Sequence, residues 1–208
     1  MMPICGKPLL SWWMELFEKH SVTEVLVNTH YLPDAVLEFV QIYNAKNTGV
    51  RLIEAYEKEL LGSGGTILAN KGFVESESDF LVCYADNLTD TNLSELIAFH
   101  RKKQSVLTMG LFYTNKPIEC GIAAIDSQDL IYEFTEKPES PKSNLANAGI
   151  YVTGQEIFKY LPNQKFIDFG KGVLPKLINK MYGYEIKDYL LDIGNLDNYE
   201  KAQKEWQL

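Results

Sequence analysis

The chain has 208 residues, of which 46% are hydrophobic and 23% charged, and this length predicts a single domain over residues 1–208 with a sizeable core. Its formal net charge of −8 argues against a protein that follows the phosphates of a nucleic acid, because such proteins carry a basic surface. The charge is compatible with a nucleotide ligand, because carboxylates can hold a divalent cation that offsets phosphate charge.

The first half of the chain alternates helical and extended patterns. Apolar residues recur at helical spacing in some segments, and short apolar runs bounded by turn residues separate them. This β-α-β order predicts parallel strands joined by right-handed crossovers. The expected elements are a helix at 9–19, a strand at 24–28, a helix opened by residues 31–34, a strand at 50–54, a helix at 67–71, a strand at 80–84, a helix at 92–103 and a strand at 105–113.

The stretch Asp79–Asn87 is the centre of this pattern. Its middle, Phe80–Tyr84, is continuously apolar and rich in strand formers, which is typical of a strand covered on both faces in a parallel sheet. Asp86 follows just after the strand, at the edge where open α/β sheets bind ligands. A lone aspartate after a strand is also a common turn or cap residue, so both interpretations of Asp86 stay open here.

From Cys120 onward the pattern changes to short strands and turns. Residues 121–126 and 130–134, joined by Ser127–Asp129, predict a β-hairpin. Together the two halves predict an α/β fold with a mainly parallel mixed sheet and a small antiparallel region. The remaining expected elements are a strand at 145–152, helices near 155–160 and 171–180, a strand at 184–190 and a terminal helix.

Two aspartates follow apolar strands directly, Asp86 and Asp192. Acidic groups at one edge of a sheet can hold Mg²⁺ through oxygen ligands, and the metal then takes phosphate oxygens as further ligands. Two turn residues would give the same pattern.

Three other short patterns are candidates for ligand binding. Gly62, Gly64 and Gly65 allow a backbone to approach a flat ligand or a phosphate closely, although a plain turn into a helix would also use them. Lys137 can act as a point charge for a phosphate, with Glu136 accepting hydrogen bonds from hydroxyls, and a surface ion pair is the alternative. The remaining pattern is a strand interrupted by Asn147 and Gly149, which indicates either a closely approaching ligand or a β-bulge.

Patterns of nucleophilic catalysis and of zinc binding are missing from the sequence. His20, His30 and His100 are widely scattered, His100 is expected to pack on an inner helix face, and no serine lies in a G-x-S-x-G turn. The three cysteines lack CxxC spacing, which suits reduced thiols. No apolar window is long enough to span a bilayer and the start lacks signal-peptide features, so we expect a cytoplasmic protein without a membrane or nucleic-acid partner.

Taken in order, these segments resemble the sugar-phosphate nucleotidyltransferases, which include mannose-1-phosphate guanylyltransferases and glucose-1-phosphate thymidylyltransferases. The resemblance covers the length of the chain and rests on the order and spacing of several motifs. They are P-I-C-G-K-P-L-L at 3–10, L-L-G-S-G-G-T at 60–66, V-C-Y-A-D-N at 82–87, C-G-I-A-A-I-D at 120–126, E-F-T-E-K-P at 133–138, L-A-N-A-G-I-Y-V at 145–152, and D-I-G at 192–194 with Tyr199 beyond it.

The resemblance implies a Rossmann-like three-layer sandwich and a reaction in which a sugar 1-phosphate attacks the α-phosphorus of a nucleoside triphosphate and releases pyrophosphate. Such chemistry depends on positioning and charge neutralisation more than on a protein nucleophile. It implies GTP as the slightly favoured nucleotide, Mg²⁺ as cofactor and a possible homodimer. The implied site consists of Asp86 and Asp192 as metal ligands and catalytic residues, Lys137 as a third catalytic residue, the base-binding loop Leu61, Gly62, Ser63, Gly64 and Gly65, with Asp86 also at the nucleotide, and the sugar-phosphate residues Gly121, Glu136, Lys137, Asn147 and Gly149.

The start of the sequence departs from the family pattern. The family begins with a strand, a G-x-G-T-R loop and a P-K-P segment, whereas Met1 falls where the residues after that segment should be. We therefore expect the first strand to be missing, a slot in the sheet, and little or no transferase activity; Lys7, in a later turn, is not assigned the missing lysine's role. A non-catalytic nucleotide-sugar-binding or regulatory subunit is the alternative, and a glycosyltransferase would favour a D-x-D motif, which residues 86–88 do not form.

Overall fold

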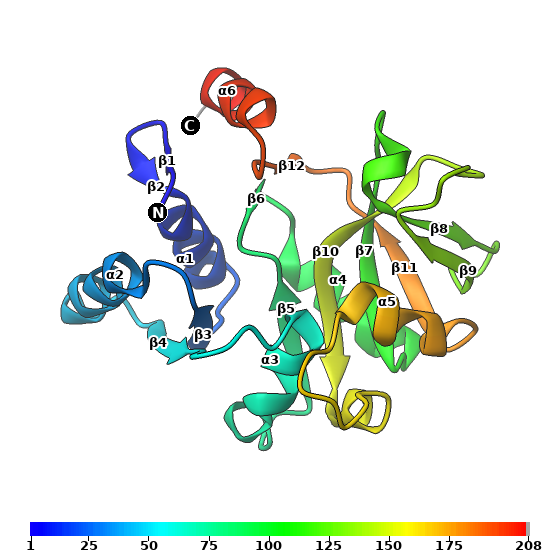
Figure 1. Ribbon diagram of the computed structural model, residues 1–208, viewed down its shortest axis with the longest axis horizontal. Helices are drawn as coiled ribbons and strands as arrows, with labels where there is room; N and C mark the ends of the chain where they lie inside the picture. Colours follow the sequence, from blue (N-terminus) through cyan, green and yellow to red (C-terminus); the bar gives the residue numbers. More distant parts are fainter. Residues whose placement is uncertain (207–208) are drawn as a thin grey trace. The chain divides into compact units, whose positions relative to one another are not determined.

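The computed structural model describes residues 1–206, which form two compact units (Figure 1). Unit 1 comprises residues 1–60, 85–91 and the chain from residue 188 onward, and unit 2 comprises residues 61–84 and 92–187. The chain therefore leaves unit 1 and returns to it twice. As a result, Asp86 and Asp192 lie in unit 1, whereas all the other candidate site residues lie in unit 2.

Unit 1 contains the predicted parallel β-α-β arrangement. β3 and β4 pair in parallel, with Glu24 opposite Arg51 and Thr29 opposite Tyr56, and α2 connects them. β1 and β2 form an antiparallel hairpin, and β6 pairs antiparallel with β12. The elements of unit 1 are β1 (Pro3–Ile4), β2 (Lys7–Pro8), α1 (Leu9–Lys19), β3 (Glu24–Thr29), α2 (Pro33–Ala45), β4 (Arg51–Tyr56), β6 (Asn87–Thr89), β12 (Leu190–Asp192) and α6 (Leu196–Glu205).

Helix α1 has the predicted bounds and buries a broad apolar face. Trp13, on this face, is 4% exposed and stacks on Phe17 with ring centroids 5.3 Å apart. Helix α2 is less buried than predicted, because only Val40 and Tyr43 are buried and Leu37 is exposed. The tight packing of α1 is relevant to the site, since α1 contacts β6 next to Asp86.

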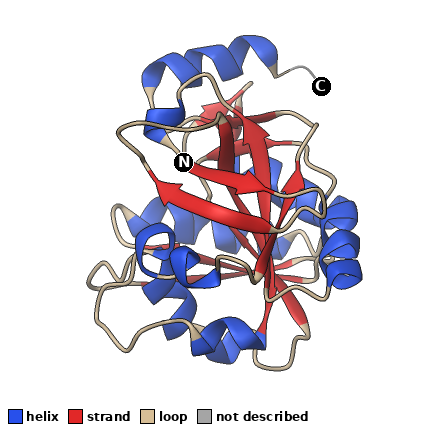
Figure 2. Cartoon of the chain, turned by 90° about the vertical axis from the view of Figure 1, so that its right-hand side faces the viewer, coloured by secondary structure: helices blue, strands red, loops and turns tan. Residues whose placement is uncertain are grey.

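A six-stranded mixed sheet forms the centre of unit 2. Its order is β11-β7-β10-β8-β9, and β5 pairs with β10 in addition. Figure 2 shows the strands from the side of the β8–β9 hairpin, which the sequence predicted. The elements of unit 2 are α3 (Ser63–Ala69), η1 (Lys71–Phe73), β5 (Asp79–Cys83), α4 (Leu93–Lys103), β7 (Leu107–Tyr113), η2 (Pro117–Glu119), β8 (Gly121–Ile125), β9 (Ile131–Glu136), β10 (Leu145–Gly154), η3 (Gln155–Lys159), α5 (Phe169–Gly172), η4 (Leu174–Leu177) and β11 (Met181–Glu185).

The core of unit 2 joins the sheet to the short helices that follow β10. Tyr151 on β10 and Phe169 on α5 are both fully buried, and their rings meet edge to face with centroids 5.2 Å apart. Helix α4 packs against β7, β10 and β11. A mixed sheet packed with helices confirms the predicted α/β, Rossmann-like class.

The direction of the strand at the centre of the sequence pattern was predicted wrongly. β5 pairs antiparallel with β10, with Val82 opposite Tyr151, and each of its five residues is only half-buried. Strand direction depends on which distant segment becomes the neighbour, and the local apolar run carries no information about it. Overall, two of the eight strand pairs within residues 1–206, β3–β4 and β7–β11, are parallel, so the sheets are less parallel than expected.

The slot expected in the sheet stays a prediction for residues 1–206. There, β3 pairs only with β4, and β5 pairs only with β10. None of the helices in the same residues is long and apolar enough to cross a bilayer.

Three of the expected elements differ from the structure in extent. The helix expected at 171–180 is divided into the short α5 and the 3-10 turn η4, because Pro175 lacks an amide hydrogen and Ile178 adopts an extended ψ of 134°. The strand expected at 184–190 is two strands, β11 and β12, in different units. The helix expected at 67–71 begins earlier, at Ser63, so the glycine cluster belongs partly to its first turn.

Candidate active site

The two aspartates meet where β6 pairs with β12. Asn87 lies opposite Asp192 in this antiparallel pair, and Asp86 directly precedes β6. The backbone amide of Ile193 donates to the carbonyl oxygen of Asp86 at 2.9 Å. The sequence placed both residues after strands, but it did not predict β6, whose pairing with β12 brings the two aspartates together.

Both carboxylates approach the same glycine. A Cβ added to Gly194 would lie 2.9 Å from Asp192 Oδ1 and 3.8 Å from Asp86 Oδ2. The amide of Gly194 also donates to Asp192 Oδ1 at 2.7 Å. A side chain at position 194 would therefore enter the space that the two carboxylates share.

The electrostatics of this pair favour a cation. Desolvation raises the pKa of Asp86, and the negative charge of Asp192 raises it further. A hard divalent ion would remove this repulsion, and Mg²⁺ in particular binds through one or two carboxylates and completes its shell with water and phosphate oxygens. Residues 1–206 contain no cluster of three or more metal-binding side chains.

The glycine cluster of unit 2 packs against the segment around Ile167. The amides of Gly64 and Gly65 donate to the Ile167 carbonyl oxygen at 2.8 and 3.3 Å, and the Ile167 amide donates to the Leu61 carbonyl oxygen at 2.8 Å. Gly62 has a φ of +74°, and a Cβ on it would lie 2.6 Å from Ile167 O. Close packing thus explains these glycines, and the cluster opens helix α3, which was the alternative to a ligand-binding loop.

Asn147 and Gly149 form a β-bulge, the second of the two interpretations that the sequence left open. The register between β10 and β7 shifts between Asn147 and Tyr151, and Gly149 has a φ of +66°. The Gly149 amide donates to Asn147 Oδ1 at 3.0 Å, and its carbonyl oxygen accepts from the Tyr84 amide at 2.9 Å. A bulge re-aims side chains and is common beside active sites, so it is compatible with a ligand role for Asn147.

A chain of hydroxyls connects the bulge to helix α3. Asn147 Nδ2 donates to the Tyr151 hydroxyl at 2.7 Å, and Tyr151, Tyr84 and Ser63 are hydrogen-bonded in succession. Ser63 Oγ accepts from the Phe169 amide at 3.0 Å. Burial raises the pKa of both tyrosines, so they remain neutral hydrogen-bonding groups.

Glu136, the last residue of β9, faces two glycines. A Cβ on Gly121 would lie 2.5 Å from Glu136 Oε2, and one on Gly170 would lie 2.7 Å from the same atom. Desolvation and then the charge of Asp168 raise the pKa of Glu136, while Lys137 and Lys171 oppose the shift. The absence of side chains at both glycines keeps room around this carboxylate.

Lys137 has an unusual backbone conformation for a lysine. Its φ of +48° lies in the left-handed region, and its amide donates to the Cys120 carbonyl oxygen at 3.1 Å. Such a conformation costs about 1–3 kcal/mol in a residue with a side chain and clusters at functional sites. Seven other non-glycine residues among those described also have a positive φ, so the ligand role of Lys137 stays a prediction.

Sequence reasoning missed several residues beside Glu136 and Asn147. Asp168 lies near Glu136, and its carboxylate accepts from the Lys171 amide at 2.8 Å as the N-cap of α5. In the sequence, the I-D-F-G segment shows an acid between two apolar residues, Ile167 and Phe169. In the structure both apolar residues are buried and Asp168 is half-buried. Tyr84 and Tyr151 were counted only as strand residues.

The Lys7 side chain contacts two residues of α1, Glu15 and Trp12. Its ammonium lies 2.6 Å from both carboxylate oxygens of Glu15 and 3.6 Å from the centroid of the Trp12 ring.

Comparison with known proteins identifies the family. The Nucleotidyl transferase family model matches residues 1–207. The chain belongs to this family. This finding confirms the resemblance that the ordered motifs indicated.

The relatives of this chain are named for different sugar phosphates and nucleotides. It is 28% identical to a glucose-1-phosphate adenylyltransferase of Clostridium acetobutylicum over 96% of this chain and 59% of the relative. It is 27% identical to a mannose-1-phosphate guanylyltransferase of Mycobacterium tuberculosis over 97% of this chain and 56% of the relative. The chain therefore spans less than two-thirds of the length of these relatives.

Solved structures support the same fold. HddC from Yersinia pseudotuberculosis, complexed with GMP-PN, superposes with a TM-score of 0.83 at 25% identity and covers 100% of this chain and 89% of that one. An apo UDP-glucose pyrophosphorylase superposes with a TM-score of 0.82 at 20% identity, covering 98% of this chain and 88% of the other. At that identity the second comparison shows the fold alone.

Proposed function

We propose that this member of the nucleotidyl transferase family binds a nucleoside triphosphate and a sugar 1-phosphate and has the site for their conversion to a nucleoside diphosphate sugar and pyrophosphate. The observation that carries the proposal is the approach of the Asp86 and Asp192 carboxylates to one glycine, in a chain of this family. Two close carboxylates with a raised pKa at Asp86 are suited to a divalent cation that carries phosphates.

In the proposed reaction, a phosphate oxygen of the sugar 1-phosphate attacks the α-phosphorus, and the bond from that phosphorus to the departing pyrophosphate breaks. Mg²⁺ held by Asp86 and Asp192 would supply charge neutralisation at the phosphates. Lys137 places an ammonium for the sugar phosphate, and the Glu136 carboxylate accepts hydrogen bonds from sugar hydroxyls. Asn147 and the backbone at Gly121 and Gly149 line the sugar, and the base lies against residues 61–65.

The identity of the nucleotide is part of the proposal. GTP is slightly favoured, since one relative is a mannose-1-phosphate guanylyltransferase and one structural neighbour was solved with GMP-PN. Other relatives are named for adenylyl and uridylyl transfer, so a panel of nucleotides is required.

The test is calorimetry and a pyrophosphate-release assay with GTP, ATP, UTP and dTTP, each paired with glucose 1-phosphate or mannose 1-phosphate, with and without Mg²⁺. The proposal expects Mg²⁺-dependent binding of at least one nucleotide. Absence of binding to every nucleotide and sugar phosphate would overturn it. The same assay tests the sequence-based expectation of little or no turnover: binding without turnover supports the non-catalytic alternative, and rapid turnover contradicts that expectation.

A further inference from the structure

Hydrogen bonds connect the backbone at Asp192 and next to Asp86 to two helices of unit 1, α6 and α1. On one side, the side-chain amide of Asn198, in the first turns of α6, donates to the backbone carbonyl oxygen of Asp192 at 2.7 Å. The backbone amide of Asn198 donates to Asn195 Oδ1 at 2.9 Å, which is the N-cap contact of that helix. The position of Asp192 is therefore coupled to the start of α6.

On the other side, a buried tryptophan fixes the backbone next to Asp86. Trp13 Nε1, from helix α1, donates to the Asn87 carbonyl oxygen at 2.8 Å. The Trp13 ring is 4% exposed and stacks on Phe17, so its orientation is held by core packing. A donor held this rigidly limits the movement of the residue that follows Asp86.

A backbone hydrogen bond connects these two contacts. Ile193, directly after Asp192, donates its amide to the Asp86 carbonyl oxygen at 2.9 Å. One continuous set of hydrogen bonds thus runs from α1 through residues 86–87 and 192–193 to α6. The two carboxylates carry like charges, so without such ties their repulsion would favour separation.

We propose that Asn198 and Trp13 are positioning residues that hold Asp86 and Asp192 at the spacing a divalent cation requires. This inference rests on the proposed function, because it assigns the pair to cation binding. Neither side chain is a ligand in this account; both act through the backbone of the residues that carry or adjoin the carboxylates. Outer-shell partners of this kind change metal affinity by about 10–100-fold when they are removed.

The chain offers a matched control for Asn198. Asn44, on α2 of the same unit, also clamps a strand backbone: its Nδ2 donates to the Leu52 carbonyl oxygen at 2.8 Å, and its Oδ1 accepts from the Leu52 amide at 3.0 Å. Asn44→Ala removes the same kind of side chain and the same kind of contact. It tests whether a lost clamp weakens cation binding through general destabilisation.

The test is Mn²⁺ binding to the full chain, measured by electron paramagnetic resonance without substrate, together with thermal unfolding of each variant. Asn198→Ala is expected to weaken Mn²⁺ binding about tenfold while Asn44→Ala leaves it unchanged. Trp13→Phe, which keeps an aromatic ring but loses the donor, is expected to weaken it similarly. If Asn198→Ala does not fold, Asn198→Leu keeps the side-chain bulk and removes the donor.

The outcomes separate this inference from the proposed function. If Asp192→Asn abolishes Mn²⁺ binding but folded Asn198 variants bind as tightly as the unaltered chain, the positioning role is wrong and the cation site stands. If Asn44→Ala weakens binding as much as Asn198→Ala, the effect is general and the positioning role is also wrong. If Asp192→Asn and Asp86→Asn leave Mn²⁺ binding unchanged, the cation site itself fails.

Discussion

Gly194 shows how a single residue controls the geometry of the candidate cation site. A methyl group there would lie 2.9 Å from Asp192 Oδ1, closer than a real Cβ contact allows, and 3.8 Å from Asp86 Oδ2. We predict that Gly194→Ala displaces the Asp192 carboxylate and weakens Mn²⁺ binding about tenfold, as removal of outer-shell support does. Titration followed by paramagnetic resonance measures this. Gly72→Ala is the control, because a Cβ there meets nothing within 4 Å, and equal effects of the two substitutions would contradict the prediction.

Gly121, in unit 2, leaves room for the Glu136 carboxylate as Gly194 does for Asp192. A Cβ on Gly121 would lie 2.5 Å from Glu136 Oε2 and 2.7 Å from Cζ of Phe134. We predict that Gly121→Ala moves the carboxylate and weakens binding of the sugar 1-phosphate at least tenfold, with little effect on nucleotide affinity. Calorimetry with each ligand separately measures the split. A sugar-phosphate affinity equal to that of the unaltered chain would show that Glu136 does not contact the sugar.

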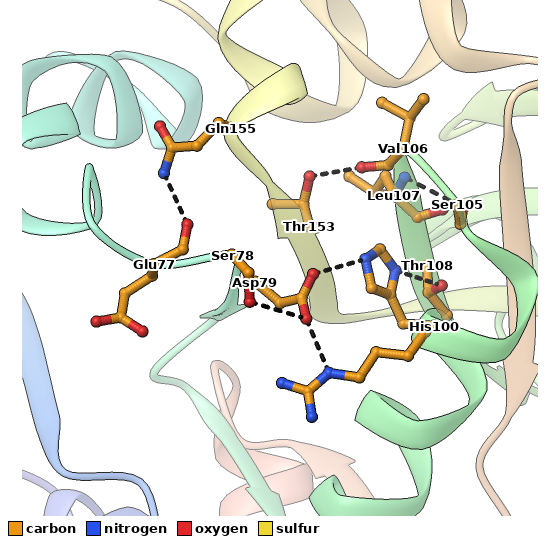
Figure 3. Close-up of polar contacts among 11 residues, drawn as sticks. Glu77, Ser78, Asp79, His100, Ser105, Val106, Leu107, Thr108, Thr153 and Gln155 are labelled. Carbon is orange, nitrogen blue, oxygen red and sulfur yellow. Dashed lines mark hydrogen bonds and ion pairs between the residues drawn. The ribbon is translucent and has the colours of Figure 1, made fainter.

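At the scale of elements, helix α4 is joined to two strands by a buried polar network (Figure 3). His100 Nε2 lies 3.6 Å from Asp79 Oδ1 on β5, and His100 Nδ1 lies 2.9 Å from the Thr108 hydroxyl on β7. Arg101 Nε also contacts Asp79, at 2.8 Å. The sequence predicted that His100 would be packed, and its 4% exposure confirms this.

This network gives a prediction on pH. Desolvation lowers the pKa of His100, Asp79 opposes that shift and Arg101 adds to it, so the folded protein prefers the neutral imidazole. The unfolded chain binds a proton near pH 6.5, so the stabilisation is complete above that pH and is lost as the pH falls through the lowered folded pKa. Denaturant unfolding from pH 8 to pH 5 should therefore show a steeper loss of stability in the unaltered chain than in His100→Gln. Parallel curves for the two proteins would contradict it.

Local periodicity explains why some elements were predictable. The apolar face of α1 and the turn between β8 and β9 depend on neighbouring residues, and both were predicted from the sequence. The antiparallel pairing of β5 with β10 and the division of the last predicted strand between two units depend on distant partners. The same distinction applies to the site: Asp86 and Asp192 were found from their strand ends, whereas Asp168 reaches Glu136 only through the tertiary fold.

At the scale of the whole molecule, the candidate site residues are distributed over the two units. Asp86 and Asp192, the proposed cation ligands, belong to unit 1, and the residues proposed to bind the base and the sugar phosphate belong to unit 2. The predicted homodimer also belongs to this scale. Analytical ultracentrifugation should give about twice the chain mass of 23.7 kDa, and a single species at the chain mass would contradict the dimer.

The most direct test of the central claim is calorimetric titration of the chain with GTP, or with whichever nucleotide of the panel binds, over a series of Mg²⁺ concentrations. The account predicts that nucleotide affinity rises with Mg²⁺ and that Asp192→Asn abolishes this dependence, because the isosteric amide removes a charged ligand and leaves the shape of the site. Mg²⁺-dependent affinity in Asp192→Asn equal to that of the unaltered chain would contradict the assignment of the aspartate pair.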